Sequence, residues 1–587
     1  MIRFLLNPHD SKKHLVELNC SFKLSAKKKI SFSLPKWSPG SYLIRDYARH
    51  IVNLEVTLNN EKVFPNQKTS NSWEIFIKSS GLINIRYLIY CFDKSVRANF
   101  FDDNRLFLNG PSTFIRVKEF SDKKHQLEIK KNVFLKNKKI TSSMNFLKQK
   151  KIYQEICYQE FIDHPIEISN TKKTHFYIAK NKFTLSLSSL NINGIDFKKI
   201  NSDTKKICNQ IIKFWGNNPN KEYHFLINCE KNGYGGLEHK SSSALLIDEQ
   251  SLPKTKNIIN REKYINFLGL CSHEYFHVWN VKRLKPKSLV KINFDSENYT
   301  SLLWFFEGFT SFYDDFLLLK SSLITPEEYI KIIEKKIDHY NFSPGNKIQN
   351  LADSSFYAWI MFYKAEDNYN NFFNNYYLTG SLIALMVDIE ISHDSNFEQS
   401  LDDLMKVLWS EFGKNEIGIN EKNIFDKTRL LYGVKITSLL KSFVYEINKL
   451  NFKSTFSKIG LAIEETKQKL NKPDSYYNKI QLLLGIRLKS ISEPIIKYLS
   501  HESCLFKKDI MVDDKVLEIN DFDFNSNKKE IYNSFFKKVK EFKVMILRNG
   551  KKIIIKTNYS KLGLPVKIKI TDNIRFNSWI NRKLKLN

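Results

Sequence analysis

The segment at residues 271–280, Cys-Ser-His-Glu-Tyr-Phe-His-Val-Trp-Asn, constrains this chain more than any other. It contains His-Glu-x-x-His, apolar residues recur at helical spacing before it, and Pro286 provides a stop beyond it. On a helix, His273 and His277 lie on one face and can point two imidazoles at one metal ion. Glu274 lies about 100° around the helix, where its carboxylate can reach a metal-bound water instead of the metal. The segment therefore predicts a helix that carries part of a metal centre.

A second segment supplies a candidate third ligand. Residues 302–313 read Leu-Leu-Trp-Phe-Phe-Glu-Gly-Phe-Thr-Ser-Phe-Tyr and give one mostly apolar helical face. Glu307 is the only carboxylate in this run, and burying a carboxylate is costly unless it is paired or bound to a metal. We therefore expect a His₂Glu site for one Zn²⁺ per chain, with a fourth position open for water. Asp314 and Asp315 are alternative ligands, at a position expected to be more exposed.

A glycine-rich turn precedes a strand-like run further towards the N-terminus. Residues 233–239 read Gly-Tyr-Gly-Gly-Leu-Glu-His, and the strand-like run follows at 242–247. Gly235 and Gly236 have no side chain, so the backbone of an extended peptide can lie close to the edge of the sheet. Near a metal helix we expect these glycines to bind substrate; elsewhere the segment would be only a turn.

Composition restricts the class of protein. The chain has 587 residues, 42% of them hydrophobic, which is enough for several folded domains. The first residues become polar too soon for a signal peptide, and no stretch approaches the ~20 apolar residues of a membrane span. Seven scattered cysteines without a Cys-x-x-Cys pair are typical of a reduced, cytoplasmic protein. We therefore expect a cytoplasmic protein without membrane contact.

The net charge of +31 raises the question of nucleic-acid binding. Lys is spread along the whole chain among abundant Asn and Ile, and its runs are short. No RNA- or DNA-binding motif accompanies them. We therefore predict that nucleic acid is not a partner.

Three regions differ in their patterning. Residues 1–170 contain short alternating runs separated by turn residues, which predict an antiparallel β domain of sandwich type. Residues 171–452 contain strand-like runs and then helical segments, which predict an α+β domain. Residues 453–587 return to β character, with strands expected at 482–488, 516–520 and 543–548. The fold class is a multidomain α+β protein.

Together these motifs resemble one family, the glycyl aminopeptidases, which are zinc metallopeptidases with a C-terminal PDZ domain. The resemblance covers nearly the whole chain. The segments that are similar to the family's motifs lie at residues 35–46, 105–110, 163–167, 235–239, 273–283 and 304–309.

The resemblance implies a thermolysin-like, gluzincin-type catalytic domain over 171–452, followed by a PDZ-like domain and tail over 453–587. It implies zinc held by His273, His277 and Glu307, with Glu274 as the general base that acts on a zinc-bound water.

The resemblance also implies roles for two residues that spacing does not assign. Tyr377 matches the tyrosine that stabilises the oxyanion, although the family's Tyr-x-Lys-Gly reads Tyr-Leu-Thr-Gly here and Tyr376 offers a second register. Glu238 matches the carboxylate that binds the free α-amine of the substrate.

The implied activity is zinc-dependent removal of N-terminal residues, Gly or Ala in type, from peptide substrates. Endopeptidase activity is an alternative if Glu238 does not require a free amine. A different alternative is a non-catalytic, chaperone-like module that binds peptide C-termini through the PDZ-like domain. In that domain, Ser-His-Glu-Ser-Cys-Leu-Phe at 500–506 replaces the expected glycine segment.

Overall fold

The structure is a computed structural model that describes residues 1–25, 28–189, 193–255, 260–447, 449–465, 473–535, 541–558 and 565–582. The chain divides into two compact units, which we describe separately. The first contains Met1–Asn298 and Phe412–Gly418, and the second contains Tyr299–Glu411 and Ile419–Leu586.

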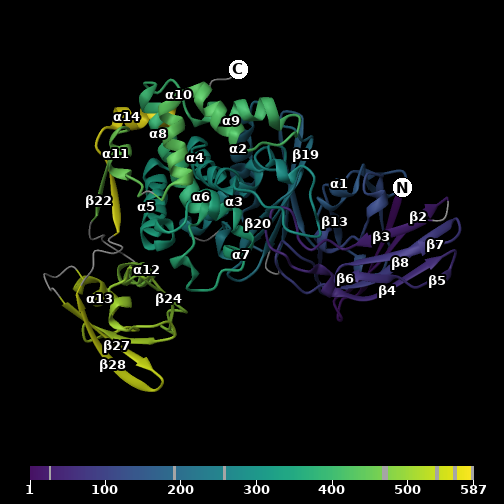
Figure 1. The fold of residues 1–587 in the computed structure, drawn as a ribbon, viewed down its shortest axis with the longest axis horizontal. Coiled ribbons are helices and arrows are strands. Elements are labelled where there is room, and N and C mark those ends of the chain that lie inside the picture. The colour runs from purple at the N-terminus through teal and green to yellow at the C-terminus, as the bar shows by residue number, and fades with distance from the viewer. Residues whose placement is uncertain are drawn as a thin grey trace. The chain divides into compact units, whose positions relative to one another are not determined.

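The first unit begins with a β domain, drawn in purple and blue in Figure 1. Its largest sheet has eight strands that bury alternate side chains, as Ile2, Phe4 and Leu6 of the first strand illustrate. The strands, in spatial order, are β14 (Phe146–Leu147), β15 (Ile152–Glu155), β12 (His125–Ile129), β1 (Ile2–Asp10), β2 (Leu15–Leu24), β8 (Gly81–Tyr90), β4 (Ile51–Leu58) and β5 (Glu61–Val63). The antiparallel prediction holds for every neighbouring pair except β1 and β12, which are parallel.

Two smaller sheets complete this domain. One orders β13 (Lys139–Thr141), β16 (Ile166–Ser169), β10 (Arg105–Leu108) and β9 (Phe100–Phe101). The other orders β11 (Arg116–Val117), β3 (Lys28–Ser33), β7 (Ser72–Ile77) and β6 (Asn66–Thr69). A short helix, α1 (Tyr158–Ile162), contributes Tyr158, Phe161 and Ile162 to the shared core.

The loop after the His-Glu-x-x-His segment is built into this β domain. Phe294 joins the hydrophobic core of the domain, and Trp37 donates from Nε1 to the Asn293 carbonyl at 2.9 Å. Asp295 accepts from Asn71 Nδ2 at 2.9 Å and forms an ion pair with Arg116 at 2.5 Å. Contacts with the β domain therefore fix the position of the loop that follows the His-Glu-x-x-His segment.

The rest of the first unit is built around a five-stranded mixed sheet. Its strands, in spatial order, are β17 (Lys172–Ile178), β18 (Asn181–Ser188), β19 (Glu222–Cys229), β21 (Ser242–Ile247) and β20 (Tyr234–Glu238). The helix α2 (Phe197–Trp215) makes the crossover between the parallel strands β18 and β19. It packs on α3 (Arg261–Phe276), which lies against β20 and β21.

The second unit begins with a helical region around α8 (Tyr376–Asp394), which is buried over most of its surface. A π-helical turn, Trp304–Phe309, packs on α8 and continues into α4. The other helices of this region are α4 (Thr310–Lys320), α5 (Pro326–Phe342), α6 (Leu351–Phe356), α7 (Ala358–Met361), α9 (Leu401–Leu408), α10 (Glu421–Tyr445) and α11 (Phe452–Ser457).

A smaller β domain follows in the second unit, between the antiparallel partner strands β22 (Leu461–Glu465) and β29 (Val566–Ile570). Its elements are α12 (Pro473–Leu484), β23 (Ile486–Leu488), β24 (Ile496–Leu499), β25 (Lys515–Ile519), β26 (Phe522–Asp523), α13 (Lys528–Ser534), β27 (Glu541–Arg548) and β28 (Lys551–Asn558). The strand predicted at 482–488 is thus wrong in its first half, because residues 482–484 end α12. The strands predicted at 516–520 and 543–548 lie within or next to β25 and β27.

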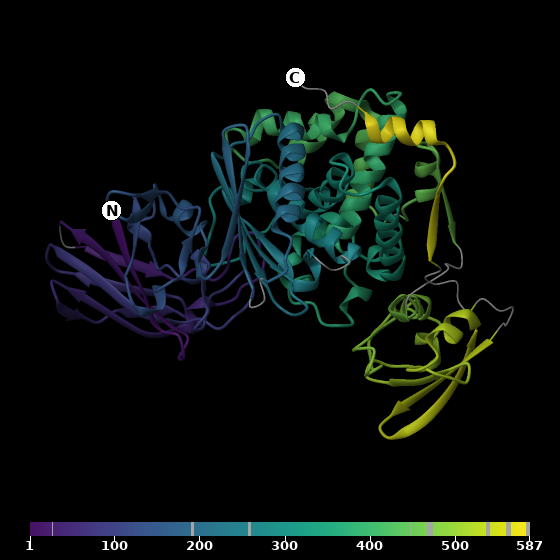
Figure 2. The ribbon, with the colours of Figure 1, turned by 180° about the vertical axis from the view of Figure 1, so that it is seen from behind.

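After β29 the chain returns to the helical region as α14 (Asn573–Asn581), which Figure 2 shows in yellow beside the green helices. Trp579 donates from Nε1 to Asp388 of α8 at 2.8 Å, and Arg582 forms a buried ion pair with the same carboxylate. Because both partners are buried, removing either one would leave a buried charge without its partner.

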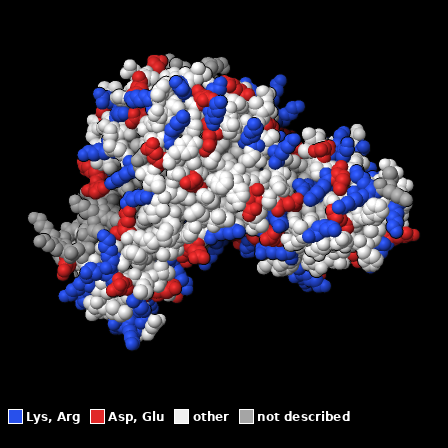
Figure 3. Space-filling model, viewed as in Figure 1, with Lys and Arg blue, Asp and Glu red and all other residues white. Residues whose placement is uncertain are grey.

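Charged side chains are mixed on the face drawn in Figure 3, where Lys and Arg are scattered with Asp and Glu between them. Among the described residues, no helix combines the length and the apolar composition that a membrane span requires.

Candidate active site

The helix α3 carries the His-Glu-x-x-His segment in its last turn. Asn260 caps the first turn by accepting from the Lys263 amide at 3.3 Å, and the inner face is buried against the five-stranded sheet. The rings of His273 and His277 lie 4.5 Å apart and nearly perpendicular. Nδ1 of His277 lies 2.7 Å from the Asn280 carbonyl, which fixes this nitrogen as the N–H donor. Nε2 of His277 is then the nitrogen with the lone pair that a metal requires.

Glu274 lies on the side of α3 that faces strand β20, and only 4% of it is exposed. Its carboxylate lies directly over Gly236. A Cβ atom at position 236 would lie 1.9 Å from Glu274 Oε1, closer than any real contact. Gly236 is therefore required for the position of this carboxylate, whereas we expected it to make room for a peptide backbone.

Glu307 lies in the π-helical turn Trp304–Phe309, in which every residue is buried. Single π-helical turns inside α-helices are frequent at functional sites. Two contacts fix the turn, because the Trp304 amide donates to Ser355 Oγ at 2.9 Å and Thr310 Oγ1 donates to the Phe306 carbonyl at 2.6 Å. The glutamate is thus held on a rigid, apolar support.

One group of side chains in the described part of the chain has the composition of a metal site. The ligand atoms of His273, His277 and Glu307 all lie within 4.8 Å of one another. Two imidazoles and one carboxylate are the donor set of catalytic zinc sites that keep a position for water. Asp314 and Asp315 do not belong to this group, and Asp315 instead forms an ion pair with Lys336 at 2.7 Å.

Tyr377 lies in the first turn of α8, where Asn375 caps the helix by accepting from the Tyr377 amide at 3.0 Å. Burial, and then the charge of Glu307, raise the pKa of the Tyr377 phenol well above its usual value. The hydroxyl therefore stays protonated near neutral pH and can act as a hydrogen-bond donor. The neighbouring Tyr376 is fully buried and packs against Phe362, with 5.1 Å between the ring centres.

Tyr363 belongs to the site although no sequence motif marks it. Its side chain forms a hydrogen bond with Tyr377. Phe362 stacks on the Tyr377 ring at 5.5 Å, so the residues before α8 hold this tyrosine from two sides. Only tertiary structure brings them together, since 13 residues of chain separate Tyr363 from Tyr377.

Glu238 ends strand β20, and 5% of it is exposed. Its carboxylate takes part in none of the ion pairs found among the described residues, and its oxygens are not among the fully buried atoms that lack a hydrogen-bond partner. It lies against Gly40, where a Cβ atom would approach both carboxylate oxygens to 2.5 Å, and Gly40 adopts a φ of +89°. The Pro-Gly turn at residues 39–40 of the β domain therefore forms the wall beside this carboxylate.

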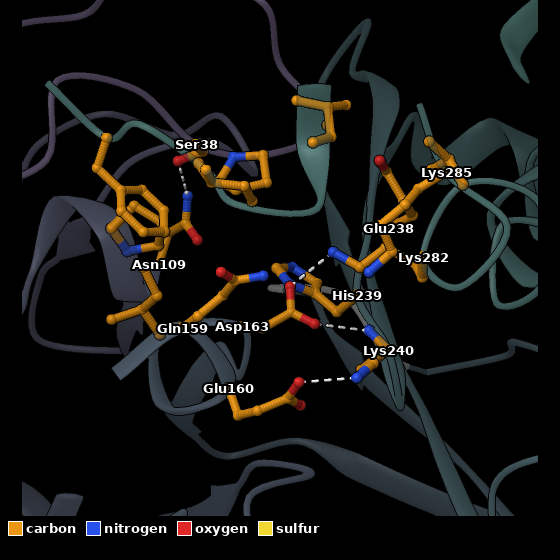
Figure 4. A pocket seen from close by; sticks show the side chains of 18 of the residues that line it. Ser38, Asn109, Gln159, Glu160, Asp163, Glu238, His239, Lys240, Lys282 and Lys285 are labelled. Carbon is orange, nitrogen blue, oxygen red and sulfur yellow. Dashed lines mark hydrogen bonds and ion pairs between the residues drawn. The ribbon is translucent and has the colours of Figure 1, made fainter. Parts of the chain in front are cut away.

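Glu238 lines a pocket of about 60 Å³ within the first unit, drawn in Figure 4. By volume it holds a few water molecules. Around Glu238, the other charges of the pocket are paired: Asp163 with Lys282 at 2.8 Å, Lys240 with Glu160 at 2.7 Å, and Lys285 with Glu416 at 3.2 Å. Although burial opposes it, the charge of Lys282 and a hydrogen bond from His239 hold the pKa of Asp163 well below its usual range.

Comparison with known proteins gives two family matches. Residues 266–383 match the M61 glycyl aminopeptidase family, and residues 3–170 match the peptidase M61 N-terminal domain. No curated protein matches the sequence at a significant level.

Solved structures give further matches. An aminopeptidase N family protein from Idiomarina loihiensis is 26% identical and aligns over 99% of this chain and 100% of its own, with a TM-score of 0.91. An M1 zinc metallopeptidase from Deinococcus radiodurans is 10% identical over 76% of this chain and 94% of its own, with a TM-score of 0.47. A mutant of that enzyme bound to a Tyr-Ser-Ala substrate has a TM-score of 0.48, at 10% identity and the same coverage.

The family matches, the full-length structural match and the His-His-Glu group define the class of the protein: it is a metallopeptidase of the aminopeptidase type. Within this class, its residues 266–383 and 3–170 are similar to the M61 glycyl aminopeptidase family and to the peptidase M61 N-terminal domain.

Proposed function

We propose that this protein is a zinc-dependent aminopeptidase that removes N-terminal residues, Gly or Ala in type, from peptides. The carboxylate of Glu238 carries the proposal, because a His₂Glu donor set serves endopeptidases equally well. This carboxylate lines the pocket and forms no ion pair among the described residues, and a substrate ammonium group would supply a charged partner for it. The similarity of residues 266–383 to the glycyl aminopeptidase family supports a small first residue.

Each residue of the site has a role in the proposed reaction. His273, His277 and Glu307 would hold zinc, which when bound supplies a Lewis acid and lowers the pKa of water to about 7. Glu274 accepts a proton from the attacking water and later returns it to the leaving amine.

Two further groups act on the substrate itself. Glu238 binds the α-ammonium group and so fixes the distance between the N-terminus and the bond to be cleaved. Tyr377 donates a hydrogen bond to the carbonyl oxygen as it becomes an oxyanion, and Tyr363 holds Tyr377 in place. Gly235 and Gly236 are proposed to border the substrate backbone along β20.

The proposal extends to the second β domain, which we take to be PDZ-like, with peptide C-termini as candidate ligands. One observation weighs against binding at the turn after α12. The Gly485 amide donates to the Leu482 carbonyl, and the Leu488 amide donates to the Gln481 side chain, so neither is left for a carboxylate. The scattered cysteines favour the cytoplasm as the location.

Zinc analysis and hydrolysis of alanine amide by the purified protein test the proposal. We expect about one zinc per chain and release of ammonia. Zinc at this ratio without hydrolysis of any short peptide would favour the non-catalytic alternative.

Glu238→Gln is expected to lower kcat/KM for alanine amide by about 10- to 100-fold, because a hydrogen bond to a charged group contributes ~1.5–3 kcal/mol. Steady-state kinetics on free and N-acetylated peptides measure the effect. Glu249→Gln, which changes a carboxylate paired with Lys254 outside the pocket, is the control. If the unsubstituted enzyme hydrolysed N-acetylated peptides as fast as free peptides, Glu238 would not bind the amine, and the enzyme would be an endopeptidase.

Tyr377→Phe is expected to lower kcat for alanine amide by about 10²-fold, because it removes one donor to the oxyanion. The matched control is Tyr376→Phe, which removes the hydroxyl of the neighbouring ring that packs against Phe362. We expect the control to change kcat by less than about fivefold and both variants to retain zinc. A larger effect at Tyr376 would show that the adjacent register is the correct one.

A further inference from the structure

The β domain places one arginine side chain beside the glycines of β20. Arg97 Nη2 donates to the Gly236 carbonyl at 3.3 Å. A Cβ atom at Gly235 would lie 3.6 Å from Nη1 and 3.9 Å from Nη2 of the same guanidinium. The carboxylate of Glu274 lies over Gly236 as well. The guanidinium and the proposed base therefore lie against the same residue of the strand, and all of these residues belong to the first unit.

This guanidinium borders the open edge of the five-stranded sheet. β20 is the last strand in the order of that sheet, and among the described strands it pairs only with β21. Strand carbonyl groups point sideways, either at the neighbouring strand or away from the sheet. Since β21 lies on one side of β20, the arginine that donates to the Gly236 carbonyl lies toward the other side. An extended peptide that adds to the edge of this sheet passes the same place.

The charge of Arg97 forms no ion pair within the part of the chain that the structure describes, whereas Lys94, three positions earlier, pairs with Glu230 at 2.9 Å. The 3.3 Å bond to Gly236 is longer than the usual N–H···O length of about 2.7–3.2 Å. Nε of Arg97 is buried and has no hydrogen-bond partner among the described residues. A guanidinium has five N–H donors in a planar fork that matches a carboxylate. Arg97 therefore has both the charge and the free donors to bind an anionic group.

The backbone of Arg97 is fixed before any ligand binds. Its carbonyl accepts from the Tyr47 hydroxyl at 2.6 Å and from Asn109 Nδ2 at 3.0 Å. The side chains on either side of it, Val96 and Ala98, are buried in hydrophobic cores. A charged group on a fixed backbone loses little conformational freedom when it binds, so more of its interaction energy contributes to affinity.

We propose that Arg97 binds a carboxylate group on the substrate residue that follows the cleaved bond. This inference rests on the proposed function, which places the substrate amine at Glu238 and the attack on the bond at Glu274. A substrate that runs along β20 from Glu238 past Gly236 reaches Gly235 and Arg97 after the cleaved bond. Glu238 and Gly235 are three residues apart, about 10 Å along a strand, and an extended dipeptide is about 7 Å long. A dipeptide therefore fits between the two charged groups.

Two kinds of substrate present this carboxylate. One is a dipeptide, whose second residue carries the free α-carboxylate. The other is a longer peptide with Asp or Glu at its second position. In both cases the guanidinium binds the same group in a charge-assisted, two-point contact.

Steady-state kinetics of the zinc-loaded enzyme on two pairs of substrates test the inference and separate the two sources. Ala-Gly and Ala-Gly amide differ in the α-carboxylate, and Ala-Glu amide and Ala-Gln amide differ in the charge of the side chain. In at least one pair we expect kcat/KM to be about 10- to 100-fold higher for the substrate with the carboxylate, the effect of a hydrogen bond between charged groups.

Arg97→Gln should reduce this preference to about twofold or less, because it removes the charge. Arg97→Lys should retain part of the preference, since it keeps the charge but loses the planar fork. The control is Arg3→Gln, which changes an exposed arginine of β1 and should leave the preference unchanged. Should Arg97→Gln unfold in a urea titration, Arg97→Met removes the charge and keeps the length of the buried stem.

Two results would overturn the inference. One is the absence of a preference for the carboxylate in both pairs. The other is an equal loss of activity on all four substrates when Arg97 is replaced, which would show that the arginine only holds β20 through the Gly236 carbonyl. Hydrolysis of alanine amide by the unsubstituted enzyme tests the proposed function separately, because that substrate has no residue after the cleaved bond.

Discussion

Glu274→Gln is expected to lower kcat for alanine amide by about 10³-fold, within the 10²–10⁴-fold range of general acid–base catalysis. The amide has the size of the carboxylate but cannot accept the proton of the attacking water. The metal ligands are not altered, so zinc content should stay near that of the unsubstituted enzyme. Single-turnover kinetics together with metal analysis separate the loss of the base from the loss of the metal.

The control for this experiment lies on the same helix. Glu262→Gln makes the same chemical change in the exposed first turn of α3, where the carboxylate provides a favourable charge at the helix N-terminus. We expect that change to cost less than ~1 kcal/mol of stability and to leave kcat unchanged. Turnover by Glu274→Gln at the rate of the unsubstituted enzyme would show that the proton is accepted elsewhere, and the proposed mechanism would be wrong.

The position of the proposed base depends on a contact between a helix and a strand. Glu274 is buried over Gly236, and a methyl group there would overlap its carboxylate. The glycine-rich turn is proposed to border the substrate, and Gly236 also leaves the space that the carboxylate of the proposed base occupies. That role depends on a helix and a strand that meet only in the folded protein, and no spacing in the sequence indicates it.

Much of the metal centre could be predicted because its signals are local. The four-residue spacing of His273 and His277 fixes their common face on any helix, and the apolar surroundings of Glu307 single it out as a costly buried charge. The structure brings these three residues together. The π-helical turn around Glu307 was not predictable, because the apolar spacing of residues 302–313 is equally consistent with an α-helix.

Other parts of the fold depend on contacts distant in sequence. The run at 482–488 is mostly apolar, and a short apolar run does not distinguish the end of a helix from a strand. The sequence therefore predicts strand for residues 482–484, which are the last residues of α12. Helix α2 is absent from the predicted elements, although Ile200, Ile207 and Ile211 lie on its buried side. Phe294 lies in a polar loop by sequence but completes the core of a domain that begins about 290 residues earlier.

The pocket around Glu238 also depends on contacts between residues that are distant in sequence. The resemblance assigns this residue to amine binding, but the place of its carboxylate on the wall of a pocket is a property of the fold. Asp163, Lys240 and Lys282 pair with other groups and so leave Glu238 as the acceptor for an incoming cation. Charge pairing over more than 100 residues of sequence cannot be read from composition or periodicity.

Gly308→Ala is expected to destabilise the enzyme and to disable it. Gly308 in the π-helical turn faces Gly380 of α8, and a Cβ atom at 308 would lie 2.7 Å from Gly380 Cα and 2.8 Å from the Tyr376 carbonyl oxygen. Both contacts are with backbone, which cannot rotate away, so the turn and the helix must separate. Overpacking of this kind costs about 3 kcal/mol of unfolding free energy, the upper end of the usual range.

The loss of activity has a geometric cause. Glu307 precedes Gly308 and Tyr377 follows Tyr376, so the same displacement moves a proposed metal ligand relative to the proposed oxyanion donor. A shift of about 1 Å in such a site costs about 10²-fold in rate. Urea unfolding, zinc content and kcat for alanine amide measure the three effects separately.

Two further variants test the explanation. Gly380→Ala should also lower both stability and activity, because its Cβ atom would lie 2.7 Å from the Trp304 carbonyl oxygen and 2.9 Å from Gly308 Cα. Ser381→Ala, at the next position of α8, removes only a hydroxyl that bonds to the Leu378 carbonyl of its own helix, and should cost less than ~1 kcal/mol. If Gly308→Ala kept both stability and activity, the close crossing of these two helices would not be what holds Glu307 and Tyr377 in register.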